Sequence, residues 1–212
     1  MQIKTLRCEF ATPAETNGKL VVVLHGRGDS SAGFHWMPST LSLPGVSWLL
    51  VNAPDDWYGS GYSWYGMPPD HGAGVLRSRR LLDALFDELA EQGFPAENIV
   101  LFGFSQGCLL TMEWGGRTDR ALAGCVGVSG YCYDAEALGK ELSDAAKSRP
   151  WLVTHGFQDD VLPYETTANQ IEELKAAGLP IHFKGYDKTH TIDPDLEDIR
   201  DAFVKMLKLD FD

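Results

Sequence analysis

The sequence predicts an α/β fold with a mostly parallel central sheet flanked by helices. Six apolar runs rich in β-branched residues recur along the chain, and helical or loop segments separate them. This alternation is typical of α/β proteins. The 212 residues are enough for one domain with a substantial core, and no repeat, linker or low-complexity tract marks a boundary. We therefore expect a single domain over residues 1–212.

The expected strands are short runs dominated by aliphatic and aromatic residues, as buried parallel strands should be. They lie at residues 19–24, 46–52, 98–102, 123–129, 151–155 and 181–186. Residues 1–10 alternate polar and apolar side chains, which also favours a strand. This segment lacks the hydrophobic region of a signal peptide, so a cytoplasmic location is expected.

Helical segments are expected between these strands and after the last one. Residues 76–89 repeat apolar side chains with a period of about 3.6, which predicts an amphipathic helix that covers the sheet. A helix is also expected to begin near Pro163, and residues 171–178 are helical up to a glycine stop. Asp193 is predicted to cap the last helix, with Pro194 in its first turn. The buried face of this helix carries Leu196, Ile199, Phe203, Met206 and Leu207.

Two segments between the predicted elements indicate how a site could be covered or lined. Between residues 129 and 151 the chain has room for only one short helix, so no cap domain is expected. Residues 53–74 are rich in Gly, Pro and aromatic residues and are expected to be irregular. Aromatic rings in such a loop face either the core or a ligand, and both alternatives stay open. The candidate walls of a substrate groove are Trp57, Tyr62, Trp64, Tyr65, Met67 and Leu162.

Composition excludes several classes of partner. The formal net charge of −12 disfavours nucleic acid and anionic lipid surfaces, because both would be repelled at long range. No apolar stretch is long enough to cross a bilayer, so stable membrane insertion is not expected. A diffusible or neutral substrate fits this composition better. We also expect a monomer or a weak homodimer.

The cysteines show no C-x-x-C pair and lie in apolar or strand-like surroundings. We therefore expect buried free thiols at Cys8, Cys108, Cys125 and Cys132. A bridge between Cys125 and Cys132 stays an open alternative, although the absence of an export signal disfavours it.

The most informative motif is Gly103-Phe104-Ser105-Gln106-Gly107, which follows an apolar strand and precedes a helical run. A G-x-S-x-G sequence in this context predicts a nucleophile elbow, in which a strained turn holds the serine hydroxyl above the sheet. Glycines on both sides allow the helix to pack closely against the strand. The alternative is a glycine-rich turn with a bystander serine.

A nucleophilic serine needs a histidine base, and the base needs a carboxylate that orients it. His190 follows the last strand and precedes the last helix, where it can lean over the sheet. Asp159 and Asp160 both follow the preceding strand, and only one of them can face the histidine. We favour Asp159, and expect Asp160 to be solvated or to cap the next helix. The alternative for His190 is an exposed loop histidine.

Acyl transfer also needs donors aimed at the oxyanion. The backbone N–H of Gln106 at a helix N-terminus is one candidate, and the N–H of Arg27 in a glycine-rich turn is the other. This turn lacks the features of a phosphate-binding loop or a dinucleotide fingerprint. No histidine and carboxylate lie at helical ligand spacing, so no metal site is predicted.

Taken in order, these landmarks resemble the phospholipase/carboxylesterase family of α/β-hydrolases, which includes the acyl-protein thioesterases. The matching landmarks are Leu-His-Gly-x-Gly-Asp (24–29), Ala-Pro (53–54), Trp-Tyr (64–65), Gly-Phe-Ser-Gln-Gly (103–107), Ser-Gly-Tyr (129–131), His-Gly-x-x-Asp (155–159) with Pro163, and a late histidine. The resemblance implies a triad of Ser105, Asp159 and His190, with oxyanion donors at Arg27 and Gln106. It also implies ester or thioester substrates, no cofactor and an α/β-hydrolase fold without a cap.

The sequence departs from the family pattern at three positions, Arg27, Cys108 and Thr189. Since Arg27 would contribute its backbone to the oxyanion hole, the reaction type tolerates the change. Its side chain suggests the hypothesis that an acidic acyl or leaving group is preferred. Other interpretations are a lysophospholipase, a non-catalytic binding module on the same scaffold, and a dienelactone-hydrolase-like enzyme, although the last would favour cysteine at the elbow.

Overall fold

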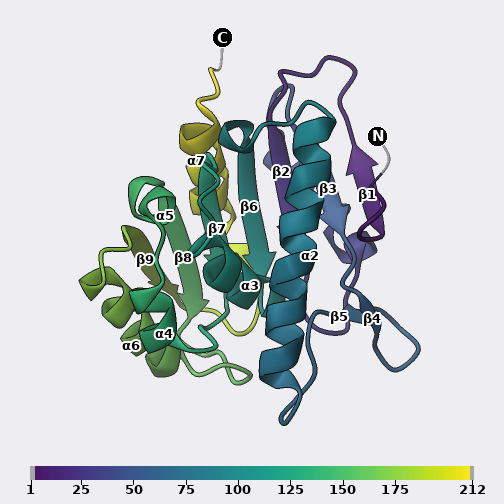
Figure 1. Cartoon of the computed structure of the whole chain (residues 1–212). Coiled ribbons are helices and arrows are strands. Elements are labelled where there is room, and N and C mark those ends of the chain that lie inside the picture. The colour runs from purple at the N-terminus through teal and green to yellow at the C-terminus, as the bar shows by residue number, and fades with distance from the viewer. Residues whose placement is uncertain (1–2, 211–212) are drawn as a thin grey trace.

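The computed structural model describes residues 3–210 and contains a seven-stranded sheet. In spatial order its strands are β1 (Cys8–Ala11), β3 (Ser47–Val51), β2 (Leu20–Leu24), β6 (Ile99–Phe104), β7 (Gly124–Val128), β8 (Trp151–Gly156) and β9 (Ile181–Tyr186). β1 is antiparallel to β3, and every other neighbouring pair is parallel (Figure 1). The carboxyl ends of six strands therefore meet at one edge of the sheet.

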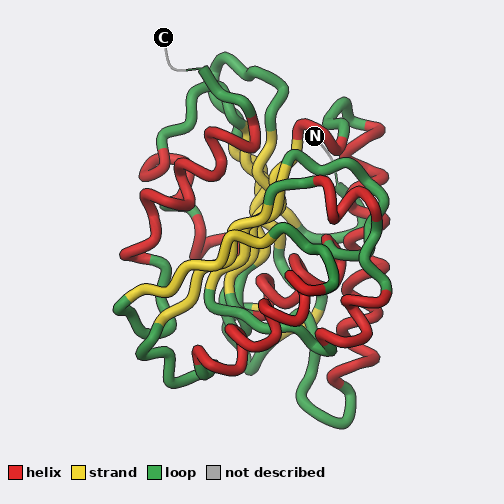
Figure 2. Tube along the Cα trace, turned by 90° about the vertical axis from the view of Figure 1, so that its left-hand side faces the viewer, coloured by secondary structure: helices red, strands yellow, loops and turns green. Residues whose placement is uncertain are grey.

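Helices cover both faces of this sheet, as the view in Figure 2 shows. One face packs against α2 (His71–Glu91), α3 (Gln106–Gly115), α4 (Ala135–Lys140), α5 (Asp144–Ser148) and α6 (Tyr164–Ala176). The other face packs against α1 (Met37–Leu41) and α7 (Leu196–Leu207). The predicted α/β architecture with helices on a mostly parallel sheet is confirmed.

Alternating side chains of each central strand supply the two core layers. In β2, Leu20, Val22 and Leu24 face the layer under α2 and α3, while Val21 and Val23 face the layer under α7. All of β2, β3 and β7 is buried. Because both faces are covered, the strands read as continuous apolar runs in the sequence, which is why their positions could be predicted.

The segment at residues 53–74 is more regular than expected. It contains a short antiparallel pair, β4 (Asp55–Asp56) with β5 (Tyr62–Ser63), and its last four residues already belong to α2. The prediction that the helix starts at residue 76 was wrong by five positions, because the first turn of α2 is glycine-rich. Residues 3–7 are not a strand, so the predicted strand at residues 1–10 is reduced to β1, which starts at Cys8. Residues 1 and 2 lie outside the described part of the chain.

Three further expectations were wrong in detail. Residues 129–151 hold two short helices, α4 and α5, each with its own side-chain cap, instead of one. The cap predicted at Asp193 is absent, because Asp193–Asp195 forms the 3-10 turn η3 and α7 begins after it. The other 3-10 turns are η1 (Ser31–Phe34) and η2 (Ala96–Asn98). All four cysteines are free as expected, and Cys108, Cys125 and Cys132 are buried. The expectation of burial was wrong for Cys8, which is only partly buried because it lies on the edge strand β1.

Candidate active site

Ser105 lies on a sharp turn between the end of β6 and the start of α3. Its φ of 54° and ψ of −112° are a strained combination for a residue with a side chain. The flanking glycines make this turn possible. A Cβ at Gly103 would lie 2.2 Å from Gly107 O, and a Cβ at Gly107 would lie 2.1 Å from Leu24 O. The strand-to-helix elbow predicted from the motif is therefore present.

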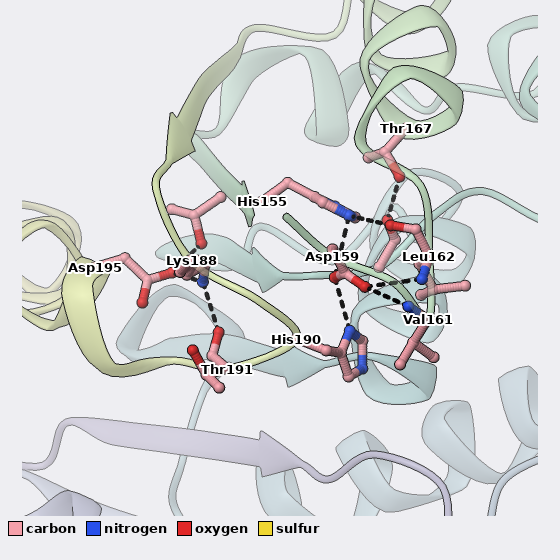
Figure 3. A network of polar contacts seen from close by, with 11 residues as sticks. His155, Asp159, Val161, Leu162, Thr167, Lys188, His190, Thr191 and Asp195 are labelled. Atoms are coloured by element: carbon pink, nitrogen blue, oxygen red, sulfur yellow. Dashed lines mark hydrogen bonds and ion pairs between the residues drawn. The ribbon is translucent and has the colours of Figure 1, made fainter. Parts of the chain in front are cut away.

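His190 and Asp159 are joined by a hydrogen bond of 2.7 Å between Nδ1 and Oδ2 (Figure 3). Asp159 follows β8 and His190 follows β9, so the ends of two neighbouring parallel strands bring the side chains together. A carboxylate can only accept, so Nδ1 carries the proton of this hydrogen bond, and in a neutral imidazole Nε2 keeps the lone pair. The histidine thus has the tautomer that a general base requires.

Asp159 is buried and held on both of its oxygens. Its Oδ1 accepts hydrogen bonds from the backbone N–H groups of Val161 at 3.0 Å and Leu162 at 2.8 Å, as Figure 3 shows. Asp160 is exposed, so only Asp159 of the two candidates faces His190. Backbone donors fix the rotamer of this carboxylate before any substrate arrives.

A second histidine, His155, contacts the same carboxylate from the other side. Its Nε2 donates to Leu162 O at 2.8 Å and lies 3.3 Å from Asp159 Oδ2. Burial lowers the pKa of His155, so its imidazole is favoured in the neutral form. These contacts are structural and hold the loop after β8 in place.

Ser105 and His190 both line one cavity of about 680 Å³ at the carboxyl edge of the sheet. Within residues 3–210, no hydrogen bond joins the Ser105 hydroxyl to His190. The His190 ring instead packs beside the Phe104 ring, with 5.0 Å between their centroids. Such catalytic contacts often tighten only when substrate binds.

The wall of the cavity contains some of the predicted groove residues and excludes others. Tyr65, Met67 and Leu162 line it, together with Arg27 and Gln106. Trp57, Tyr62 and Trp64 do not, which corrects the expectation for these three. Trp64 is fully buried and donates its indole N–H to His25 O, so it packs in the core. Trp57 lies under the Arg27 guanidinium, and Tyr62 stacks with Arg7.

Gln106 has a second role that its sequence position did not reveal. Its side chain is buried, with Oε1 accepting from Trp64 N at 3.0 Å and Nε2 donating to Tyr65 O at 2.9 Å. These bonds fasten the Tyr65 loop to the N-terminus of α3. The backbone N–H of Gln106, in the first turn of that helix, points out of its unsatisfied end.

Sequence reasoning missed several residues of the cavity wall, among them His71, Tyr131 and Phe104. His71 lies in the segment that was expected to be irregular, whereas it is the first residue of α2. Tyr131 and Phe104 belong to landmarks that were noted only for their serines. Their position within two residues of a serine at a strand end was the signal that could have placed them.

The fold and the arrangement at the strand ends are those of α/β-hydrolases. Esterase PE8 is 26% identical and superposes with a TM-score of 0.83 over 95% of this chain and 99% of its own. SOBER1 of Arabidopsis thaliana is 25% identical and has a TM-score of 0.81 over 89% of this chain and 99% of its own. Both are solved structures.

Residues 7–207 match the family described as Phospholipase/Carboxylesterase, and the chain belongs to this family. The acyl-protein thioesterase 1 of Schizosaccharomyces pombe is 33% identical to it over 171 residues, which are 74% of this chain and 76% of the relative. The protein is a hydrolase of the carboxylesterase or thioesterase type. No helix in the described part of the chain is long and apolar enough to cross a bilayer.

Proposed function

We propose that the protein cleaves a small-molecule carboxylic ester or thioester with Ser105 as nucleophile, His190 as general base and Asp159 as the residue that orients the base. The observation that carries this proposal is the bond from His190 Nδ1 to Asp159 Oδ2, with Ser105 on a strained elbow in the same cavity. A rotation of the serine hydroxyl or of the imidazole would complete the relay once substrate fills the cavity.

The chemistry follows from these positions. His190 Nε2 takes the proton of Ser105, and the serine oxygen attacks the acyl carbon. The oxyanion then lies between the N–H groups of Arg27 and Gln106, where one well-placed donor is worth about 3 to 4 kcal/mol. The protonated His190 passes its proton to the leaving oxygen or sulfur, and an acyl-enzyme remains. A water activated by His190 releases the acid and regenerates Ser105.

The two oxyanion donors come from neighbouring strands. Arg27 follows β2 and Gln106 follows β6, and β2 pairs with β6 up to Leu24 and Gly103. A Cβ at Gly26 would lie 3.2 Å from Ser105 Cβ, so the β2 loop runs close beside the elbow. This closeness supports a shared oxyanion hole.

The test is the substitution Ser105→Ala, assayed with a 4-nitrophenyl ester and with a fluorophosphonate probe. Turnover and labelling should both disappear while the circular dichroism spectrum stays unchanged. Ser39→Ala, which removes an exposed hydroxyl in α1, should keep both. If Ser105→Ala retained turnover, the assignment would be wrong, and a wild-type protein that neither reacts nor turns over would be a binding module.

We further propose a cytoplasmic location, and the free cysteines support it, since reducing compartments keep thiols unpaired. A monomer or a weak homodimer remains our prediction for the oligomeric state. Sedimentation of the purified protein at several concentrations would decide between the two.

A further inference from the structure

The cavity wall includes two unlike pairs of side chains. His190 packs beside Phe104, and the Arg27 guanidinium contacts Met67, with 2.9 Å between Nη1 and Sδ. In the proposed function, on which this inference rests, His190 protonates the leaving atom, so the leaving group lies next to His190. The acyl chain then extends away from His190 into the rest of the cavity, whose wall includes Arg27.

Arg27 is a cation without a counter-ion. Within residues 3–210 no carboxylate lies within ion-pair distance of its guanidinium, and its buried Nε has no hydrogen-bond partner. The guanidinium is held over the Trp57 ring, at 5.3 Å from the centroid, and the thioether of Met67 is only a weak acceptor. The packing therefore orients this charge without neutralising it.

Asp29 is the other charged group on the cavity wall besides the catalytic candidates. Its carboxylate faces the backbone of the following turn. Oδ1 accepts from Ser30 N at 2.7 Å, and it lies 2.2 Å from the position that a Cβ at Gly33 would take. The carboxylate of Asp29 is thus engaged on its own loop, and Arg27 stays available.

Polar aromatic side chains stand beside Arg27. Tyr65 lines the cavity, is fully buried and interacts through its hydroxyl with the side chain of Tyr131. The His71 ring stacks on it with 4.8 Å between centroids, and the Tyr131 hydroxyl lies 3.3 Å from His71 Nε2. Burial, followed by the charge of Arg27, lowers the pKa of His71, while burial raises the pKa of both tyrosines. The cluster thus offers one fixed positive charge and neutral donors.

We propose that Arg27, His71 and Tyr131 bind a carboxylate on the acyl portion of the substrate, with Tyr65 supporting His71 by ring stacking, so that the enzyme prefers half-esters or half-thioesters of dicarboxylic acids. A guanidinium binds a planar carboxylate through two parallel N–H groups, and phenolic hydroxyls supply further donors. A local cation of this kind offsets the repulsion that a chain with a net charge of −12 exerts on an anionic substrate.

The test compares kcat/KM for 4-nitrophenyl hydrogen adipate and 4-nitrophenyl hexanoate, whose acyl chains have the same length and differ in the terminal carboxylate. The wild type should use the acidic ester at least as well as the neutral one. Arg27→Leu should lower the ratio of acidic to neutral ester by about tenfold or more, the effect of one lost charged hydrogen bond. Tyr131→Phe keeps the ring and should lower the ratio by about threefold.

Two control variants separate recognition of the substrate carboxylate from general effects of charge and packing on activity. Lys140→Met removes one positive charge from the exposed surface of α4, and should leave the ratio unchanged. Val161→Ala removes an apolar part of the cavity wall, and should change both esters equally.

The proposal is overturned if Arg27→Leu and Tyr131→Phe both keep the ratio within about twofold of the wild type. If Arg27→Leu does not fold, the ratio of acidic to neutral ester in Tyr131→Phe and in the wild type decides. A wild-type preference for the neutral ester above about tenfold would also overturn the proposal. In each of these cases, turnover of the neutral ester that is lost in Ser105→Ala would still support the proposed function. Failure of the carboxylate-binding proposal can therefore be distinguished from failure of the proposed function.

Discussion

Lys188 and Asp195 form an ion pair in the interior of the protein, with 2.5 Å between Nζ and Oδ2 and almost no exposed side-chain surface. Lys188 Nζ also donates to Thr191 O at 2.7 Å (Figure 3). In addition, Thr154 Oγ1 donates to Asp195 Oδ2. The pair therefore ties both ends of the loop that carries His190 to β8 and to the start of α7. No sequence motif pointed to it.

Replacing Lys188 with Met should therefore be costly, because it leaves the Asp195 carboxylate buried without its cation. We expect a loss of about 3 to 5 kcal/mol in the free energy of unfolding, measured by urea denaturation. Activity should fall as well, since the loop of His190 loses an anchor. Lys140→Met breaks an exposed pair with Glu136 and should cost less than about 1 kcal/mol. Equal losses for the two variants would contradict this view.

Gly103→Ala tests the close contact beneath the elbow. The new Cβ would meet the backbone of Gly107, which cannot move without shifting α3, so we expect at least about 2 kcal/mol of destabilisation and a large loss of kcat. Gly66→Ala is the matched control, because its Cβ would meet only Asp70 Cβ at 3.7 Å, an ordinary contact. Thermal unfolding and ester turnover measure both variants, and an unperturbed Gly103→Ala would refute the steric account of the elbow.

Gln106→Ala tests the link between α3 and the Tyr65 loop. It removes the acceptor of Trp64 N and the donor to Tyr65 O, both buried, so the free energy of unfolding should drop by about 1 to 3 kcal/mol. Because Tyr65 lines the cavity, KM should rise together with the stability loss. The exposed amide of Gln158 bonds Asp187, and Gln158→Ala should change neither quantity. A Gln106→Ala enzyme with wild-type KM would show that the loop holds its place without this side chain.

The buried thiols predict how stability depends on alkaline pH. Burial raises the pKa of Cys125 from 9.0 to about 11 and that of Cys108 to about 12. Above pH 9 the unfolded chain therefore loses these protons while the folded chain keeps them, so stability is complete below pH 9 and falls as pH rises toward 11. Each thiol contributes a slope of at most about 1.4 kcal/mol per pH unit.

Urea denaturation between pH 8 and pH 11 measures this slope. Cys125→Ala should flatten it relative to the wild type, whatever the variant does to stability at neutral pH. A slope that is the same in Cys125→Ala and in the wild type would contradict the assignment to this thiol.

The strands were predictable because they are buried on both faces, so their residues are apolar without interruption, as in Val21, Val22 and Val23. The start of α2 was not, because His71, Gly72 and Gly74 have weak helix propensity and only packing makes them helical. The close approach of Gly74 to Tyr65, where a Cβ would lie 2.7 Å from Tyr65 Cβ, requires a residue without a side chain. Local propensity and tertiary packing point in opposite directions there.

The candidate residues Ser105, Asp159 and His190 could be named from the order of motifs along the chain, because in a parallel sheet each strand end returns to the same edge. That His190 and Asp159 touch follows from the register of β8 with β9. The residues of the cavity wall could not be predicted in this way. Trp64 and Tyr65 are neighbours in an aromatic loop, yet only Tyr65 lines the cavity, and no periodic pattern distinguishes the two.

The amino-acid sequence alone determined the fold class, the strand positions and the residue types at the strand ends, because these depend on local hydrophobicity and on short motifs. Packing over long sequence distances determined the rest: the pairing of Lys188 with Asp195, the unpaired charge of Arg27 and the gathering of His71 and Tyr131 beside Tyr65. Such contacts depend on which side chains fill the space between separate elements, and no short stretch of the chain encodes that information.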